Sequence, residues 1–395
     1  MLIREKVKQA SALCAEFGVD CWLTFTRETA INGDPVLPFL VDAALTWHSA
    51  LVVCRDGRSY AIVGEYDRLG VNDLGAYTEV TGYVKGVKEP FQELMRRLNP
   101  AAIAVNYSRE SEICDGLTHG MYLTLVDFLT EIGMEGRLQP ADRIVSSLRQ
   151  RKTPAEIASI RSAIRHTEEI FALVGREARA GMTEREVAAL VTAERKRRGL
   201  EAAWEPKVCP AVFTGPDTAA AHYAPTDRMI EPGHILNMDF GVKVDGYCSD
   251  LQRTYYVLRP GEANAPAEVL RGFNTIVESI QKAKEGIRPG VQGVAIDMIA
   301  RNVITTAGYP EFPHGLGHQV GRFPHDGTAL LGPAWEKYAG KPFYALEPGM
   351  VFTIEPRLPV PGRGIATIEE MVVVTESGAA WLSEPQTELM IIRSR

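Results

Sequence analysis

A short internal repeat in the second half of the chain limits the folds open to this sequence. "EPGHILNMD" (231–239) and "EPGMVFTIE" (347–355) each begin with a Glu-Pro-Gly turn, continue through a strand-like run and end on a carboxylate. A second acid follows each copy, Asp250 in one case and Glu369 in the other. A single match of this length is ordinary turn chemistry. Because turn, strand and acid recur together, the repeat predicts two related half-domains that deliver acids to one shared place.

The stretch "NMDFGVKVDGYCSDLQRTYYV" (237–257) predicts a β-hairpin that carries the first two acids. Asp245-Gly246 is a favoured two-residue turn, and it places Asp239 opposite position 252. Asp250 is two residues along from that position, so the two aspartates share one face. On an isolated hairpin both would point to solvent, but the flanking "ILNM" and "TYYV" runs are typical of interior sequence. Because buried carboxylates are costly unless they are neutralised, the pattern predicts a bound cation.

Three of the eight histidines, at 314, 318 and 325, lie within twelve positions. The spacing of His314 and His318 is that of two zinc ligands on a helix, but the glycines of "HGLGH" disfavour a helix and predict a loop. A lone histidine is usually a core or surface residue. The concentration of three in one irregular segment favours a functional site.

Glu355 and Glu369 each enter an apolar strand in "TIEPRLPVPGRGIATIEEMVVV", and Glu370 is expected to point away from Glu369. With the two aspartates, these glutamates give four carboxylates, whose charge balances two divalent cations. An oxygen-rich set with one imidazole suits Mn, Co or Zn, with Mn or Co preferred over a lone structural Zn. The sequence therefore predicts a carboxylate-bridged dinuclear metal site.

Composition and charge exclude several broad classes. The 395 residues include 43 basic and 50 acidic side chains, and a formal charge of −7 provides no basic footprint for nucleic acid. The N-terminus predicts an amphipathic helix rather than a signal peptide, and no stretch is suited to a membrane span. Six cysteines without a CxxC pair favour reduced, buried thiols and a cytoplasmic location.

The chain is expected to form two domains. Residues 1 to about 145 alternate between helical and strand-like patterns, such as "DCWLTFT" and "EPFQELMRRLN". A polar, basic segment follows, in which Thr153 is a suitable N-cap and Pro154 a suitable first helical residue. We therefore predict an α/β domain over 1–150 and a second domain over 151–395.

These motifs resemble those of the pita-bread metallohydrolases, which include prolidase, aminopeptidase P, methionine aminopeptidase and creatinase. "MDFG", "DGYCSDLQRT", "HGLGHQVG", "TIEP" and "IEEMVVV" occur in the family's order. The two-domain layout is similar to the prolidase, aminopeptidase P and creatinase branch. The resemblance implies an α/β (α+β) protein, with a creatinase-like domain before a pita-bread domain of pseudo-two-fold half-domains around a curved antiparallel sheet.

The resemblance also implies roles for individual residues. Two divalent ions, manganese first and cobalt or zinc as alternatives, would share five ligands: Asp239, Asp250, His318, Glu355 and Glu369. Histidines that line the family's substrate site match His222 and His325. His314 matches a histidine close to the metals.

Two positions depart from the prolidase pattern. Thr367 stands where an arginine is usual, two residues before the last glutamate ligand, and Pro359 stands where a tyrosine is common. Arg357 or Arg363 is a candidate to restore the lost positive charge. The departures affect substrate choice and rate, because the ligand set is intact.

The predicted function is metal-dependent hydrolysis of Xaa-Pro peptide bonds, with a small Xaa-Pro dipeptide as substrate. Glu355 is expected to take a proton from the attacking water and pass it to the leaving nitrogen, while His222 and His325 hydrogen-bond the substrate oxygen. The alternatives are an aminopeptidase P, a non-peptide C–N hydrolase of the creatinase or ectoine-hydrolase kind, and a silent binding protein. The branch implies a homodimer in which a loop with Trp47 reaches the partner's site; the alternative places Trp47 in the domain core.

Overall fold

This computed structural model describes residues 2–217 and 224–393. The chain divides into two units, Met1–Arg149 and Gln150–Arg395. Each unit has buried apolar clusters of its own.

The first unit is built on a six-stranded mixed sheet in the order β4-β3-β2-β1-β5-β6. Its strands are β1 (Cys21–Thr26), β2 (Ser49–Cys54), β3 (Ser59–Gly64), β4 (Glu79–Tyr83), β5 (Ile103–Val105) and β6 (Leu138–Pro140). Its helices are α1 (Leu2–Glu16), α2 (Glu65–Asp73), α3 (Lys88–Leu98), α4 (His119–Thr130) and α5 (Asp142–Gln150). The predicted N-terminal amphipathic helix is α1.

Alternation along β1 gives this unit two apolar cores. Trp22 packs in a cluster with residues of α1 and α5, whereas its neighbours Cys21 and Leu23 pack in a cluster with residues of α3 and α4. Successive side chains of a strand point to opposite faces, so one buried strand supports helices on both sides. Trp47 is 54% exposed, so its placement in the domain core is wrong.

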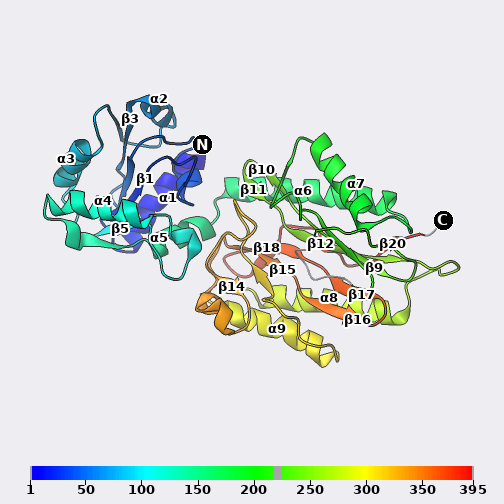
Figure 1. Ribbon diagram of the computed structural model, residues 1–395. Helices are drawn as coiled ribbons and strands as arrows, with labels where there is room; N and C mark the ends of the chain where they lie inside the picture. Colours follow the sequence, from blue (N-terminus) through cyan, green and yellow to red (C-terminus); the bar gives the residue numbers. More distant parts are fainter. Residues whose placement is uncertain (1, 218–223, 394–395) are drawn as a thin grey trace. The chain divides into compact units, whose positions relative to one another are not determined.

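The second unit places its strands between two pairs of helices (Figure 1). The helices are α6 (Pro154–Glu177), α7 (Glu184–Arg197), α8 (Ala267–Gly286) and α9 (Gly293–Thr306). A four-stranded sheet contains β20 (Met390–Ile392), β12 (Leu251–Val257), β9 (Ile235–Phe240) and β8 (Ala211–Thr214), in that order. A three-stranded sheet contains β15 (Val351–Ile354), β18 (Glu370–Val374) and β19 (Ala379–Trp381), in that order.

Seven further strands lie in the described part of the second unit. They are β7 (Glu201–Ala202), β10 (Val242–Val244), β11 (Tyr247–Cys248), β13 (Gly317–His318), β14 (Leu330–Leu331), β16 (Arg357–Val360) and β17 (Gly364–Thr367). The "HGLGH" segment is not helical, as predicted. Its end forms β13, which the sequence did not predict, because the backbone there pairs with β14.

The two copies of the repeat build similar local structures. β9 and β15 each follow a turn whose glycine has a positive φ, +92° at Gly233 and +86° at Gly349, a conformation that favours glycine. Each strand then pairs with a later antiparallel strand, β9 with β12 and β15 with β18. An isolated antiparallel bridge between Gln252 and Glu369 joins the two halves. The two predicted half-domains therefore meet at the acids.

Local sequence signals fix the ends of the elements that carry the site. Thr153 caps α6 in a capping box with Glu156, and Pro154 is the first residue of the helix, as predicted. Asp245 and Gly246 both have positive φ, +50° and +77°, as the two-residue hairpin turn requires. The turn sets the register that places Gln252 opposite Asp239.

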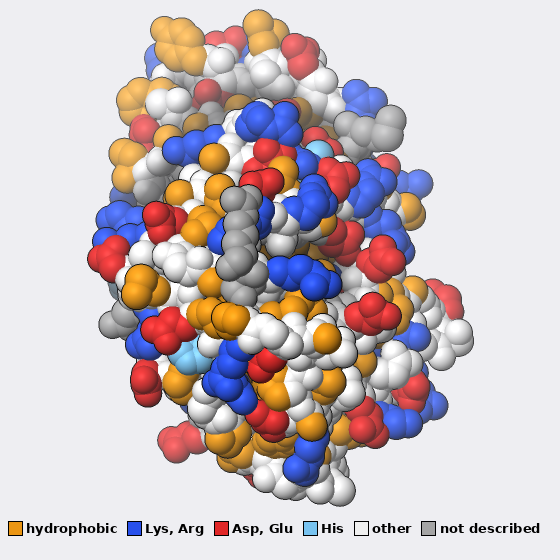
Figure 2. Space-filling model, turned by 90° about the vertical axis from the view of Figure 1, so that its right-hand side faces the viewer, with side chains coloured by type: hydrophobic (Ala, Val, Ile, Leu, Met, Phe, Trp, Pro, Cys, Tyr) orange, Lys and Arg blue, Asp and Glu red, His pale blue; other side chains and the backbone are white. Residues whose placement is uncertain are grey.

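The surface carries mixed charge. On the face drawn in Figure 2, Lys and Arg side chains are interleaved with Asp and Glu side chains. None of the helices within the described residues is long and apolar enough to cross a bilayer. All six cysteines are buried and unpaired, as predicted.

Candidate metal centre

The ends of five strands and loops bring the candidate ligands together. Asp239 lies on β9, Asp250 directly precedes β12, and Glu369 directly precedes β18. His318 ends β13 and Glu355 follows β15. The backbone NH of Glu355 donates to the carbonyl of Leu316 at 2.8 Å, which holds the "TIEP" and "HGLGH" segments side by side.

The imidazole of His318 lies at the middle of this group. Its Nε2 is 3.3 Å from Glu355 Oε1, 3.8 Å from Asp250 Oδ2 and 3.9 Å from Glu369 Oε1. Its Nδ1 is 3.0 Å from the carbonyl oxygen of Pro324. Because a carbonyl only accepts, Nδ1 carries the proton and the lone pair of Nε2 faces the three carboxylates. A lone pair that faces anionic oxygens needs a cation between them.

The pKa values of all four carboxylates are raised, and three of the four residues are buried while Glu355 is partly exposed. Burial raises the pKa of Asp239 from its ordinary value of 3.8 to about 7. Burial also raises the pKa of Asp250, Glu355 and Glu369 well above the usual range, and the nearby acids of the same group add to each shift. Four acids that repel one another in a buried site are a strong attractor for metal ions.

The donor set fits divalent metal ions. One ligand atom from each of Asp250, His318 and Glu369 lies within 4.8 Å of the others, as atoms around a single ion do. Asp239 Oδ1 is buried and has no hydrogen-bond partner in the part of the chain that the structure describes. A buried oxygen without a donor is costly, and a cation would satisfy it. Carboxylates with one imidazole suit manganese, cobalt or zinc.

The histidines predicted to lie at the site differ in their exposure and in their contacts. The ring of His325 lies 4.2 Å from that of His318, centre to centre, and is exposed beside the group. The Nδ1 of His314 is 2.8 Å from the carbonyl oxygen of Gly315, and burial lowers the pKa of this imidazole to about 4. His314 is therefore neutral at pH 7. His222 lies outside the described residues.

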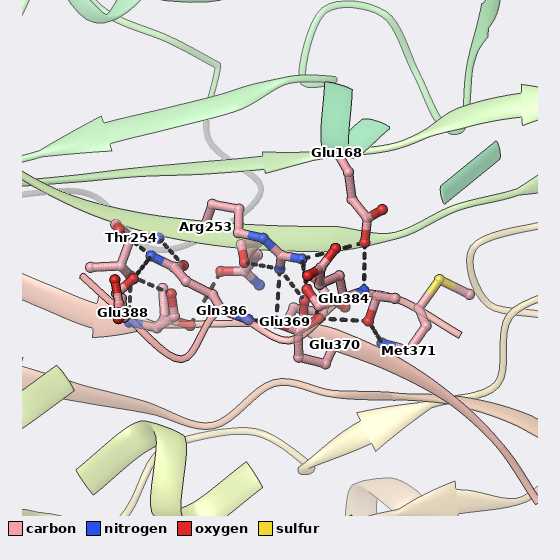
Figure 3. A network of polar contacts seen from close by, with 12 residues as sticks. Glu168, Arg253, Thr254, Glu369, Glu370, Met371, Glu384, Gln386 and Glu388 are labelled. Atoms are coloured by element: carbon pink, nitrogen blue, oxygen red, sulfur yellow. Dashed lines mark hydrogen bonds and ion pairs between the residues drawn. The ribbon is translucent and has the colours of Figure 1, made fainter. Parts of the chain in front are cut away.

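A buried ion pair supports Glu369 from behind (Figure 3). Arg253 and Glu370 are 3% and 1% exposed, and Arg253 Nη1 lies 3.1 Å from Glu370 Oε1. The same Nη1 donates to the backbone carbonyl of Glu369 at 3.1 Å. Glu370 also accepts hydrogen bonds from Ser383 Oγ and the backbone NH of Gln386. Glu370 points away from Glu369, as predicted.

The sequence interpretation missed Arg253 and Thr353 as supports of the site. The signal for Arg253 was its place beside Gln252, because the strand that meets Glu369 there must also bring Arg253 to Glu370. Thr353 Oγ1 accepts from the backbone NH of His318 at 3.1 Å and donates to Glu355 at 3.4 Å. No sequence pattern marked it.

Comparison with known proteins places these residues in a family. The model of metallopeptidase family M24 matches residues 158–376, more than half of the chain. A Xaa-Pro dipeptidase of Pyrococcus furiosus is 30% identical over 276 residues, which cover 70% of this chain and 75% of the relative. An uncharacterised peptidase of Staphylococcus aureus is 28% identical over 333 residues, 83% of this chain and 86% of the relative.

Solved structures confirm the predicted fold. A Xaa-Pro dipeptidase from Bacillus anthracis superposes with a TM-score of 0.75 at 23% identity, covering 99% of this chain and 100% of that one. An X-Pro aminopeptidase from Thermotoga maritima gives a TM-score of 0.73 at 24% identity, covering 96% and 99%. The mixed α/β architecture is the pita-bread fold of the prolidase branch, and the chain belongs to metallopeptidase family M24.

Proposed function

We propose that this metallopeptidase is a Xaa-Pro dipeptidase that works with two divalent ions, manganese by preference. The observation that carries the proposal is the set of three carboxylates within 4 Å of one imidazole, with a fourth acid, Asp239, whose buried Oδ1 has no partner among the described residues. The dinuclear count rests on charge, because four carboxylates balance two divalent ions. The match to the Pyrococcus furiosus dipeptidase supports the substrate class.

The five candidate ligands would divide the work of holding the ions. Asp239 on β9, Asp250 and Glu369 just before β12 and β18, and Glu355 just after β15 would offer oxygens, while His318 would offer Nε2. When bound, the ions supply a Lewis acid for the scissile carbonyl and lower the pKa of water toward neutrality. Arg253 and Thr353 act behind the ligands, on Glu369, His318 and Glu355, and fix their orientation.

Glu355 is the proposed general base. Its carboxylate lies at the edge of the group, 3.3 Å from His318 Nε2, and burial raises its pKa. A carboxylate with a raised pKa accepts a proton from water and releases it again to the leaving imino nitrogen. His325, exposed beside His318, is placed to donate a hydrogen bond to the substrate oxygen, and His222 keeps the same proposed role. His314 remains a proposed neutral helper close to the site.

Two other functions remain as alternatives on the same scaffold. An aminopeptidase P would cleave the same bond in longer peptides. A non-peptide C–N hydrolase of the creatinase or ectoine-hydrolase kind is favoured by Thr367 and Pro359, which replace the arginine and tyrosine usual in prolidases. We also propose that 1–150 is the creatinase-like domain and 151–395 the catalytic domain, and that the protein is a cytoplasmic homodimer that binds neither nucleic acid nor membrane.

One experiment separates these functions. Bound metal is counted in purified protein supplied with manganese, and a Xaa-Pro dipeptide, a longer Xaa-Pro peptide and several non-peptide amides are then assayed. We expect two ions per chain and turnover of the dipeptide. Turnover only of the longer peptide or of a non-peptide amide would favour an alternative, and protein without metal or turnover would refute the hydrolase.

A further inference from the structure

One arginine beside the candidate metal centre has no anionic partner. Arg357 is half-buried, and its side chain makes no hydrogen bond or ion pair with any residue in the ranges 2–217 and 224–393. Burial lowers the pKa of its guanidinium, and Glu355 opposes that shift. A guanidinium withdrawn from water without a partner is costly, so a position of this kind is suited to an anionic ligand.

The strand register places Arg357 at the wall of the site. In the β16–β17 hairpin, Arg357 lies directly opposite Thr367, so their side chains share one face. Arg357 is two residues after Glu355, and Thr367 is two residues before Glu369. Thr367 Oγ1 lies 3.2 Å from the side chain of Gln252, the residue paired with Asp239. The shared face is therefore the face of the candidate ligands.

The charges around Arg357 point the same way. It raises the cost of protonating His314 and lowers the pKa of Glu355, so its guanidinium is within electrostatic reach of both. None of its nitrogens pairs with a carboxylate among the described residues. Four carboxylates and two divalent ions would together be neutral, and the charge of Arg357 would then have no carboxylate left to balance it in this group.

The other arginine of the hairpin, Arg363, already has an anionic partner. Arg363 Nη2 pairs with Glu268 at 2.7 Å, and its Nη1 donates to the carbonyl of Gly233 at 3.2 Å. Arg357 and Arg363 are the two candidates for restoring the charge missing at Thr367. Of these two, only Arg357 has a guanidinium that is not already paired with a carboxylate among the described residues.

We propose that Arg357 binds the free carboxylate of the substrate and so makes the enzyme select dipeptides. This inference rests on the proposed function. In a Xaa-Pro dipeptide the carboxylate carbon is three bonds from the scissile carbonyl carbon, whereas a longer peptide or an amide has no charge at that place. Arg357 opens β16 two residues after Glu355, and its guanidinium is within electrostatic reach of the Glu355 carboxylate. A guanidinium binds a carboxylate through paired hydrogen bonds.

The test compares Arg357→Met with the matched control Arg363→Met, using Ala-Pro and its C-terminal amide as substrates. We expect Arg357→Met to raise KM for Ala-Pro roughly tenfold to hundredfold, with little change in kcat and little change for the amide. Arg357→Lys should recover part of the loss, and Arg363→Met should behave as wild type. An equal loss on both substrates, or no loss on either, would overturn the proposal.

A binding measurement keeps this test separate from that of the proposed function. If wild-type protein with bound metal hydrolyses neither compound, the proposed function fails, and calorimetry with the same two compounds still tests Arg357. A preference for Ala-Pro over its amide that disappears in Arg357→Met supports carboxylate binding. Equal affinity of the wild type for both compounds refutes it. Metal content and melting temperature of each variant are measured in parallel to exclude misfolding.

Discussion

Asp239 holds a carboxylate where the surrounding protein gives one of its oxygens no donor. Its Oδ1 is buried and unpartnered among the described residues, while its strand is fully buried and its two neighbours, Met238 and Phe240, are apolar. Such a residue is stabilised by a proton or by a metal ion. Its pKa of about 7 means that the choice between them falls within the physiological range.

This choice predicts a pH-dependent effect of metal removal. The pKa of Asp239 is raised from 3.8 to about 7 in the folded state, so between these pH values the folded protein holds a proton that the unfolded chain has released. This protonation stabilises the fold at low pH, and the stabilisation is lost as the pH rises through 7. In metal-free protein the melting temperature should therefore fall between pH 6 and pH 8. The melting temperature of metal-loaded protein should change less. The difference in melting temperature between the metal-loaded and metal-free forms should therefore be several degrees larger at pH 8 than at pH 6.

The control for this prediction is Asp239→Asn, which keeps the shape and removes the titrating group. Metal-free Asp239→Asn should lose less stability between pH 6 and pH 8 than metal-free wild type. A gap of equal size at both pH values in the wild type would show that these carboxylates do not carry the effect.

Glu355 is expected to be indispensable for turnover. Glu355→Gln removes a group that accepts and returns a proton, a contribution on the order of 10²–10⁴ in rate, and kcat should fall at least that far. Metal content is measured on the same sample, since Glu355 is also a candidate ligand. Glu376→Gln, at an exposed position on the same half of the chain, is the control and should leave kcat unchanged. Near-normal turnover of Glu355→Gln with full metal occupancy would remove Glu355 from the mechanism.

At the scale of elements, the β12–β18 junction connects the ligands to the core. Arg253 on β12 pairs with Glu370 on β18 and also binds the backbone of Glu369, so one guanidinium fixes both strands. Ser383 and Gln386, from the segment after β19, donate to the same carboxylate. The backbone that carries Glu369 is therefore fixed by contacts to Arg253 and to the neighbouring Glu370, not by contacts to the Glu369 carboxylate itself (Figure 3).

Removing one partner of this pair should destabilise the second unit strongly. Arg253→Met or Glu370→Gln leaves a buried charge uncompensated, and the free energy of unfolding should drop by about 3–5 kcal/mol. The double variant should lose less than the sum of the two single losses. Urea unfolding measures the loss. Arg185→Met, which breaks an exposed pair with Asp227, is the control and should change stability by about 0.5 kcal/mol or less. An equally small effect of Arg253→Met would mean that the Arg253–Glu370 pair does not stabilise the β12–β18 junction.

Local sequence rules predicted the elements of the site but not its far contacts. The Asp245-Gly246 turn fixed which residues face Asp239, since a two-residue turn leaves one register. The orientation of Arg363 was not predictable, because it depends on Glu268 of α8, a residue almost a hundred positions away in the chain. Likewise β13 forms only through pairing with β14. Contacts of this kind depend on tertiary packing rather than on local pattern.

At the scale of the whole molecule, all six cysteines are buried, and burial raises the pKa of Cys14 to about 12 and that of Cys54 to about 11. A thiol reacts as the thiolate, so reaction is opposed both by the burial of these side chains and by the raised pKa values, which keep the thiols protonated. We expect native protein to show almost no reaction with a thiol reagent at pH 8, and all six thiols to react after denaturation. Rapid labelling of even one cysteine in native protein would contradict the burial of the set.

The bridge between Gln252 and Glu369 joins two halves that each hold only part of the ligand set. Asp239 and Asp250 come from the earlier half, whereas His318, Glu355 and Glu369 come from the later one. During synthesis on a ribosome, Glu369 emerges after the four other candidate ligands. A nascent chain therefore cannot assemble the full ligand set before this residue has left the ribosome, and ions are captured with all five ligands only after that point.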